Sequence, residues 1–327
     1  MIDENIIPDE LFVPATDNEY EAPMRQPVTY WQDAWKRFAG NKVAIISAIF
    51  IVLITLLAIL IPVFSRYAYD QQIRGDEFIA PFTTWKHLLG TDNLGRDMLV
   101  RLMIGSRISL LIGIVVSILV VVIGVLYGTI SAYFGGLVDT VMMRIVDILY
   151  AVPTILVIII LRIVLKERLT GLFEGNPTLT SIGPGLVSIF IAFSLLYWLD
   201  MARMVRGQIL SVKQLEYVNA ARALGAKPWR IMTKHLIPNC IGIIIVTATL
   251  NIPVAIFTEA FLSFMGLGVS SPMASLGSLA NDGVDMIYSY PHMLILPSVL
   301  ISLIILSFNL VGDGLRDALD PRMKNKS

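Results

Sequence analysis

Two uncharged stretches, IGPGLVSIFIAFSLLYWL (182–199) and LIPNCIGIIIVTATLNIPVAIFT (236–258), flank the polar segment EYVNAARALGAKPWRIMTKHLIP (216–238). The polar segment contains one acid, Glu216, and four basic side chains, Arg222, Lys227, Arg230 and Lys234. Loops rich in Lys and Arg between membrane spans tend to stay on the cytoplasmic side. We therefore expect residues 216–238 to form a cytoplasmic loop that faces a soluble partner.

The composition indicates that the whole chain is a membrane protein. Of its 327 residues, 56% are hydrophobic and 15% are charged, and the mean hydropathy is +0.73. One soluble core cannot bury so much apolar surface. The net charge is zero, so we expect no nucleic-acid partner. The lone Cys240 excludes an internal disulfide and a cysteine-based metal cluster, and we expect no metal site.

Six stretches are apolar enough to cross a bilayer, which takes about 20 helical residues each. The sequence therefore predicts an all-α membrane protein with its transmembrane domain at 43–315. One stretch is less clear than the others because it contains Arg162. The expected spans are 43–64, 106–134, 146–165, 182–204, 236–264 and 293–313.

The segments outside the spans are polar. Residues 1–29 are rich in Asp, Glu and Pro and lack a cleavable signal, which predicts a disordered cytoplasmic tail. In 30–42, aromatic side chains alternate with basic ones, which is typical of an amphipathic helix at the membrane interface. Residues 316–327 are expected to form a second cytoplasmic tail.

The distribution of basic residues supports cytoplasmic N- and C-termini. With six spans and both ends inside, 16 of the 25 Lys and Arg residues lie in cytoplasmic segments and 9 lie outside. Within the second span, Gly124, Gly128 and Ala132 recur at intervals of four, so another helix can approach closely there. We expect ordinary helix packing at this ridge.

The polar segment predicts two short helices at an angle. Ala220, Ala221 and Ala223 favour a helix. Gly225 permits the left-handed turn that ends a helix, and Pro228 is suited to the first position of the next one. Such a unit can plug into a groove of another protein and transmit its movement to the attached spans.

These residues resemble the EAA motif of binding-protein-dependent ABC importer permeases. The resemblance consists of Asn219-Ala220-Ala221, then three residues, Gly225, nine residues and the sequence HLIP at 235–238. The motif's Glu is Asn219 here, and its first hydrophobic residue before the proline is His235. Glu216, one turn before Asn219, is a candidate for the missing carboxylate. The coupling residues implied are Glu216, Asn219, Ala220, Ala221, Gly225, Ala226, Pro228 and Pro238.

Further stretches are similar to the C-type subunit of the oligopeptide and dipeptide permease branch, so that the resemblance covers nearly the whole chain from Tyr30 onward. They are WQDAWKRFAGNK (31–42), LGTDNLGRD (89–97), WLDMARMVRGQ (198–208), EAFLSFMGLG (259–268) and GDGLRDALDPR (312–322). The resemblance implies the fold of a type I ABC importer permease, with a coupling-helix loop between spans four and five. It also implies a location in the bacterial cytoplasmic (inner) membrane, as a multi-pass protein.

The resemblance implies several partners. These are a second, homologous B-type permease chain, two cytoplasmic ABC ATPase subunits, an extracytoplasmic peptide-binding protein, short peptides as substrate and membrane lipid. No GxxxxGK[ST] motif occurs in the sequence, so we expect ATP and magnesium to bind the ATPase subunits rather than this chain. The scattered His87, His235 and His292 give no support for enzyme chemistry, and we expect a non-catalytic subunit.

Several charged or polar residues near the spans are candidates for specific roles. Glu259 ends an uncharged run, and a carboxylate inside a membrane is costly, so we place it with Asn251 and Met265 at the translocation path or gate. Two pairs spaced three apart, Asp200 with Arg203 and Arg144 with Asp147, are candidate structural ion pairs. The turn-rich segment 90–97 either packs the outer gate or touches a soluble binding protein.

Two alternative functions remain open at this point. One is a permease subunit for nickel or another small solute, because that branch resembles this chain in the same motifs, although the 14 Met residues are dispersed. The other is an ion-coupled secondary transporter, which would carry coupling ions on its own membrane charges and would need no ATPase.

Overall fold

The computed structural model describes residues 29–173, 183–268 and 273–320. Residues 1–28 of the tail predicted at 1–29 and the end of the chain at 321–327 therefore lie outside the described part. The described residues form helices and loops, and the only strand-like feature among them is an isolated bridge between Thr91 and Asp97. The α-helices are α1 (Tyr30–Gly40), α2 (Lys42–Phe64), α3 (Met98–Phe134), α4 (Gly136–Tyr150), α5 (Thr154–Phe173), α7 (Pro184–Leu196), α8 (Trp198–Val212), α9 (Glu216–Ala223), α10 (Pro228–Ile231), α11 (Ile241–Leu262), α12 (Leu276–Val284) and α13 (His292–Leu319).

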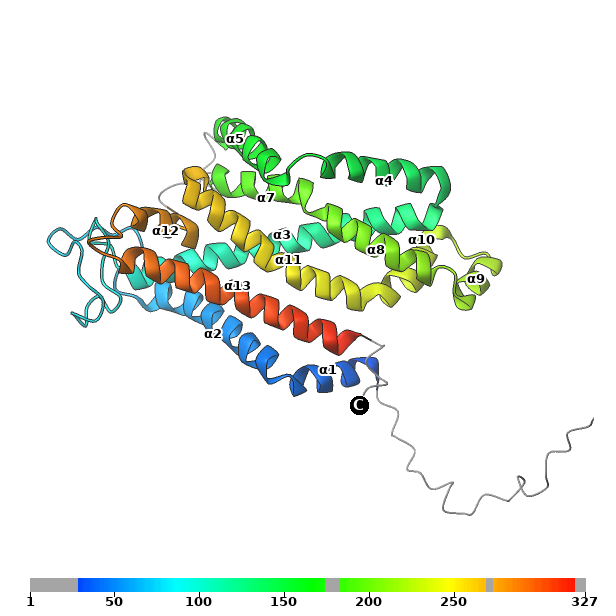
Figure 1. Cartoon of the computed structure of the whole chain (residues 1–327), viewed down its shortest axis with the longest axis horizontal. Coiled ribbons are helices and arrows are strands. Elements are labelled where there is room, and N and C mark those ends of the chain that lie inside the picture. Colours follow the sequence, from blue (N-terminus) through cyan, green and yellow to red (C-terminus); the bar gives the residue numbers. More distant parts are fainter. Residues whose placement is uncertain (1–28, 174–182, 269–272, 321–327) are drawn as a thin grey trace, which may run out of the picture.

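Most of the long helices run along the long axis of the molecule (Figure 1). The helices α9 and α10 lie at one end, while the connection 65–97 and α12 lie at the other (Figure 1). Among the described residues, five helices are long and apolar enough to cross a membrane, or up to six if one bent pair counts as a span. The predicted all-α membrane fold is confirmed, whereas the side on which the termini lie stays a prediction.

The third predicted span, 146–165, is not a continuous helix. It straddles a break between α4 and α5, whose axes are bent by 85°. Pro153 lies in this break, where it has no N–H to donate and disfavours helical backbone in the residue before it. The helix α4 therefore ends at Tyr150, and a new helix begins at Thr154.

Other helix limits differ from the expected spans by a few residues or by one turn or more. The fourth span consists of two helices, α7 and α8, that meet at Tyr197. The helix α3 starts at Met98, before the expected 106. The helix α13 passes through Gly312 and Gly314 and continues to Leu319. Residues 316–319, which we assigned to a tail, are helical because Ala318 and Leu319 are buried against α1.

The segment expected at the membrane interface forms α1. Thr29 and Gln32 form a capping box at its start. Ala34 and Phe38 are buried and pack toward α11 and α13, while Trp31 and Trp35 are exposed on the other side. This amphipathic arrangement fits an interfacial helix, although its depth in a membrane stays a prediction.

The helix α3 is the central element, and its small residues allow close packing against α8. A Cβ on Gly124 would lie 2.6 Å from Cβ of Met201, and one on Gly128 would overlap the carbonyl oxygen of Ala202. Ala132, one turn further, is fully buried. The expected ordinary packing at this ridge is therefore what the structure contains, with α8 as the neighbour.

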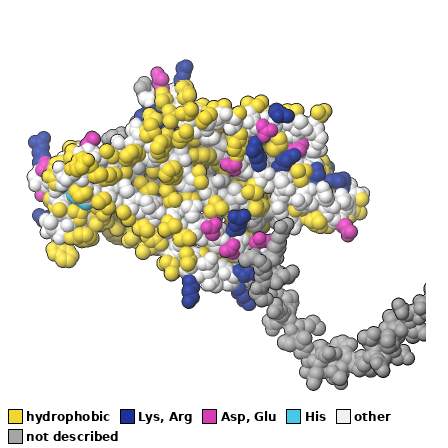
Figure 2. All heavy atoms as spheres, viewed as in Figure 1, with side chains coloured by type: hydrophobic (Ala, Val, Ile, Leu, Met, Phe, Trp, Pro, Cys, Tyr) yellow, Lys and Arg dark blue, Asp and Glu magenta, His cyan; other side chains and the backbone are white. Residues whose placement is uncertain are grey.

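The surface divides into apolar and charged regions. Figure 2 shows hydrophobic side chains over much of the middle of the molecule; charged side chains lie at both ends and along the lower edge, with many toward the end that bears α9 and α10. Exposed apolar side chains line most of α2, as a lipid-facing helix requires. The molecule therefore has a polar end that can meet a soluble partner.

We predict that Gly128→Val loosens the α3–α8 contact. The added side chain overlaps the backbone of α8, and overpacking of this kind costs about 1–3 kcal/mol or more. Thermal unfolding of the purified protein in detergent should therefore occur at a lower temperature. Gly171→Val is the matched control, because no atom lies within 4 Å of a Cβ placed there; equal unfolding temperatures for both variants would contradict the prediction.

Candidate functional site

The polar segment 216–238 forms a compact loop between α8 and α11. After α8 the chain enters α9, turns at residues 224–227 and enters α10. It then continues through a π-helical turn, Met232–Leu236, and a 3-10 turn, Ile237–Cys240, into α11. The two short helices expected from the sequence are present, and the second is joined to the next span without a break in helical backbone.

The turn after α9 depends on Gly225. This residue has φ +77, which side chains with a Cβ rarely adopt. The amide of Gly225 donates to the carbonyl oxygen of Arg222 (3.0 Å), and the amide of Ala226 donates to that of Ala221 (3.1 Å). This pair of bonds is a Schellman motif, which satisfies carbonyl groups at the helix end. Pro228 takes the first position of α10, where a missing N–H costs nothing.

The π-helical turn before α11 has a local cause. Pro238 lacks an N–H group, so it cannot donate to the residue one turn earlier. The ladder shifts register, and the amide of Ile237 donates to the carbonyl oxygen of Met232. Such wide turns inside helices are often found at functional sites.

One face of the loop is anchored in the hydrophobic core. Val218, Ile231 and Leu236 are fully buried, and Met232 is nearly so. They belong to the same buried cluster as side chains of α3, α8 and α11. A displacement of the loop must therefore move the helices to which it is attached, because a packed core transmits strain.

The opposite face of the loop is open. Leu224 is 88% exposed and Trp229 is 60% exposed. The four basic side chains of the loop are also exposed. An apolar pair surrounded by positive charge, on a rigid support, is suited to an interface with another protein.

Asn219 and Glu216 lie on the exposed part of α9. The side-chain amide of Asn219 donates to the carbonyl oxygen of Gln214 (3.4 Å), and its oxygen accepts from Arg222 (3.4 Å). Glu216 is the first residue of α9, where a carboxylate is favoured by the helix dipole. Whether Glu216 replaces the motif's carboxylate stays a prediction.

Glu259 is fully buried, at the contact between α3, α11 and the segment before α12. Its two carboxylate oxygens accept hydrogen bonds from Ser109 (3.2 Å) and Ser263 (2.5 Å). Ser275 donates to the hydroxyl of Ser263 (3.1 Å), which extends the network. In this conformation the carboxylate is enclosed by hydroxyl groups instead of facing an open cavity, so its expected role at the path or gate remains a prediction.

Asn251 lies eight residues before Glu259 and Met265 six residues after it, whereas Arg162 is distant in sequence but close enough for its charge to act on Glu259. The Nδ2 atom of Asn251 is buried and makes no hydrogen bond within the described residues, and Met265 is 54% exposed in the turn that follows α11. Arg162 of α5 is buried and donates to the carbonyl oxygen of Gly268. Its charge acts on Glu259. Sequence reasoning missed this relation because 97 positions of sequence separate residues that meet only through helix packing.

The four residues expected to pair within one helix interact across two helices instead, except Arg144, which forms no ion pair within the described residues. Arg203 of α8 pairs with Asp147 of α4 (2.7 Å) and lies 4.1 Å above the ring of Tyr150. Tyr150 in turn donates to Asp200. Within the described part of the chain, Asp200 forms no ion pair with Arg203, and Arg144 forms none with Asp147. The physical reason is that α4 packs beside α8, so charges on different helices are closer to each other than neighbours on one helix.

The structure contains a further ion pair, bidentate and between two helices, that the sequence analysis did not predict. Arg206 binds Asp139 through Nε and one terminal amino group, both at 2.5 Å, and Ser131 also donates to this carboxylate (2.5 Å). Such bidentate pairs are geometrically specific. No spacing rule would have found it, because Asp139 and Arg206 lie on separate helices.

Comparison with known proteins supports one family. Residues 121–325 match the family described as the binding-protein-dependent transport system inner membrane component. Residues 29–81 match the N-terminal transmembrane domain of oligopeptide transport permease C. The chain belongs to the family of binding-protein-dependent transport system inner membrane components. It is accordingly a multi-pass protein of the bacterial inner membrane.

Two members of this family align over nearly the whole chain. The oligopeptide transport system permease protein OppC of Bacillus subtilis (strain 168) is 45% identical over 320 residues, which cover 97% of this chain and 99% of that protein. The dipeptide transport system permease protein DppC of the same organism is 41% identical, with 98% and 95% covered.

A solved structure has the same kind of fold. A chain of the MetNI methionine ABC transporter, in an inward-facing conformation, aligns with a TM-score of 0.52 and 20% identity, covering 68% of this chain and 98% of that chain. Similarity at this level concerns the fold alone. The family and this neighbour agree with the expected fold of a type I ABC importer permease.

We predict that Glu259 has separable structural and charge-dependent roles. Glu259→Gln retains hydrogen-bonding partners for Ser109 and Ser263, so the thermal unfolding of the protein should be almost unchanged. Glu259→Leu leaves these hydroxyls without the carboxylate and should destabilise the protein by about 1–3 kcal/mol. Glu167→Leu, at an exposed position of α5, is the control and should have no effect.

The expected role of Glu259 at the path adds a second outcome. Glu259→Gln should lower substrate uptake by the assembled transporter and substrate-stimulated ATP hydrolysis, although the protein remains folded. If both rates equal those of the unmodified protein, the role at the path is wrong.

Proposed function

We propose that this chain is a transmembrane permease subunit of an ATP-driven importer that moves short peptides into the cytoplasm. The observation that carries this proposal is 45% identity to an oligopeptide permease over 97% of the chain. The nickel and ion-coupled alternatives are not favoured, because the two relatives described above, which align over nearly the whole chain, are named as oligopeptide and dipeptide permeases.

The energy for transport comes from partner subunits in this proposal. The sequence has no GxxxxGK[ST] motif, so ATP and magnesium bind to two cytoplasmic ATPase subunits. The loop 216–238 docks on these subunits through Leu224 and Trp229, with its basic side chains around them. Since Val218, Ile231 and Leu236 are fixed in the core, closure of the ATPases moves the loop as a rigid body and carries α8 and α11 with it.

A second, B-type permease chain completes the path. The helix α11 and the π-helical turn after it leave several large apolar side chains exposed along one face, with the spacing of successive helical turns: Val254, Phe257, Phe261 and Phe264. We assign this face to the second permease chain, because α11 also carries Asn251 and Glu259, which are the candidates for the path. A peptide-binding protein delivers the substrate at the opposite end from the loop 216–238.

Uptake by a reconstituted complex tests the proposal. The chain is co-expressed with the permease and ATPase genes adjacent to its own, and the purified complex is placed in proteoliposomes with the neighbouring peptide-binding protein. We expect a labelled short peptide to accumulate only when ATP and magnesium are present on the ATPase side. A nickel salt in place of the peptide and an imposed proton or sodium gradient in place of ATP are the controls. Accumulation driven by the gradient without ATP would overturn the proposal.

We predict that Gly225→Val uncouples ATP hydrolysis from uptake. A β-branched residue is strained at φ +77, so the turn between α9 and α10 should change shape while the buried anchors stay in place. The ATPase subunits should still co-purify, but the amount of peptide imported per ATP hydrolysed should fall several-fold.

Gly225→Asn is the matched control for this change. Asn tolerates the left-handed conformation better than other residues with a Cβ, so coupling should be largely retained. Normal uptake per ATP hydrolysed in the Gly225→Val variant would contradict the proposed role of this turn in coupling.

A further inference from the structure

A polar pocket lies at the end of the molecule opposite the loop 216–238. It has a volume of about 340 Å³ and is formed where the end of the 65–97 connection and the start of α3 meet α12 and the turn after α11. Its polar lining consists of Arg96, Arg101, Ser263, Ser278, Asn281 and Asp282. Two guanidinium groups therefore meet in a space large enough for a small ligand or one end of a longer one.

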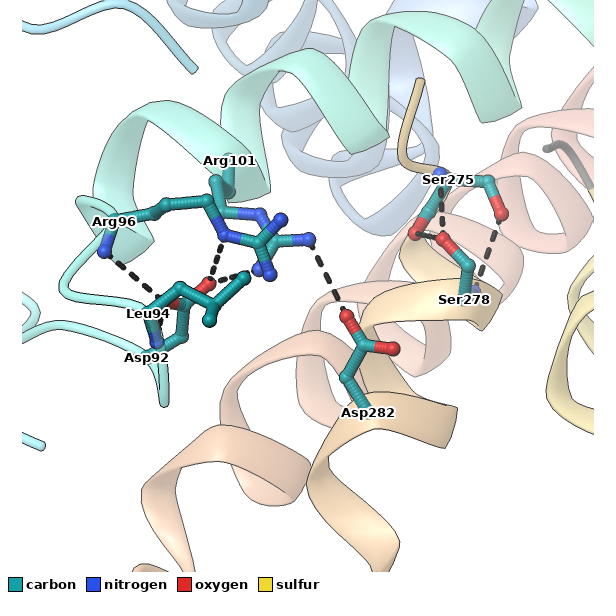
Figure 3. Close-up of polar contacts among 7 residues, drawn as sticks. All are labelled: Asp92, Leu94, Arg96, Arg101, Ser275, Ser278 and Asp282. Carbon is teal, nitrogen blue, oxygen red and sulfur yellow. Dashed lines mark hydrogen bonds and ion pairs between the residues drawn. The ribbon is translucent and has the colours of Figure 1, made fainter. Parts of the chain in front are cut away.

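Both arginines are held by the same buried carboxylate. Asp92 has a side chain only 1% exposed. One of its oxygens accepts from the amides of Leu94 and Arg96, both at 2.9 Å, and the other accepts from Nε of Arg96 (2.7 Å) and from Arg101 (Figure 3). Each carboxylate oxygen of Asp92 thus accepts two hydrogen bonds, and Asp92 fixes the position of both guanidinium groups.

The amino groups of the two arginines that do not bind Asp92 have few hydrogen-bond acceptors. Within the described residues, Arg96 uses only its Nε, so its two terminal amino groups have no hydrogen-bond acceptor. Arg101 extends its second amino group to Asp282, at 3.3 Å (Figure 3). The Asp282 side chain is 42% exposed, so this bond competes with water and is easily replaced.

The helix that carries Asp282 is firmly placed. At its start, Ser275 and Ser278 exchange hydrogen bonds in a capping box, with distances of 2.9 and 3.2 Å (Figure 3). Gly277 packs against the backbone of Ala260, and a Cβ on Gly283 would lie 2.6 Å from the amide nitrogen of Leu294. The pocket is therefore built on a rigid support, as a binding site requires.

We propose that this pocket binds the terminal carboxylate of a peptide on its way into the translocation path. The free amino groups of Arg96 and the second amino group of Arg101 donate to the peptide carboxylate, which displaces Asp282 from Arg101. Arginine suits this role because its planar fork matches a carboxylate. The volume admits one end of a peptide, so the pocket recognises the peptide terminus and makes no contact that selects the rest of the peptide sequence. This inference rests on the proposed function as a peptide importer.

The test compares peptides with a free carboxylate and the same peptides with an amidated C-terminus. Uptake is measured in proteoliposomes that contain the complete complex and its binding protein, at peptide concentrations below saturation. Because the binding protein is the same throughout, its own preference cancels when the ratio of free-acid to amidated uptake in a variant is divided by that of the unmodified complex. Arg96→Gln should lower this ratio about tenfold, as expected for the loss of hydrogen bonds to a charged group.

Controls separate recognition from a structural effect. Arg96→Lys retains the positive charge and should restore part of the ratio. Arg74→Gln removes an exposed arginine from the same connection, outside the pocket, and should leave the ratio unchanged. If Arg96→Gln lowers uptake of both peptide forms equally, or changes neither, the pocket does not recognise the carboxylate.

Asp282→Asn gives a second test that does not depend on the buried pair. Asp282 is partly exposed, so the variant should fold normally. Removal of the competing carboxylate should raise the free-acid to amidated ratio several-fold, whereas an unchanged or lower ratio would overturn the proposal. Failure of the unmodified complex to import either peptide form with ATP would instead refute the proposed function.

Discussion

The close approach of α8 to α3 is the contact on which the functional geometry depends. Gly124 and Gly128 present no side chain to α8, so the two backbones come together where ordinary residues would overlap. The contact is reinforced at its end toward the loop, where Lys213 donates to the carbonyl oxygen of Ala132 (2.6 Å) and Arg206 binds Asp139. Because α8 leads directly into α9, the position of the exposed loop follows from this packing.

The two polar regions of the protein are connected by continuous helical backbone. The loop 216–238 passes through its π-helical turn into α11, and α11 ends beside the polar pocket that contains Arg96 and Arg101. Between them lies Glu259, which is bonded to Ser109 of α3 and, through Ser263, to Ser275 before α12. Cores and hydrogen-bonded networks tend to switch between discrete arrangements, so a displacement at one end of α11 has a physical route to the other.

Much of the fold could be predicted from local patterns. The spans are recognisable because lipid requires long apolar helices. The Schellman turn was foreseeable because Gly225 follows three alanines and stands three positions before Pro228. The expected continuous span at 146–165 was wrong, because hydropathy shows how long an apolar stretch is but not whether its helix axis changes direction within it. Pro153 marks the break, but several other prolines lie within intact helices, such as Pro62 in α2 and Pro297 in α13.

The sequence by itself determined the class of protein, the number of apolar stretches and the basic, exposed nature of the loop, since these depend on composition and on residues close together in the chain. Only the tertiary structure decided which charges meet. Arg203 pairs with Asp147 across two helices, and Ser109 reaches Glu259 from 150 residues away. Such contacts depend on the rotation and spacing of packed helices, which the shape of many side chains sets together. The pocket around Arg96 and Arg101 exists for the same reason, because three separate segments converge to form it.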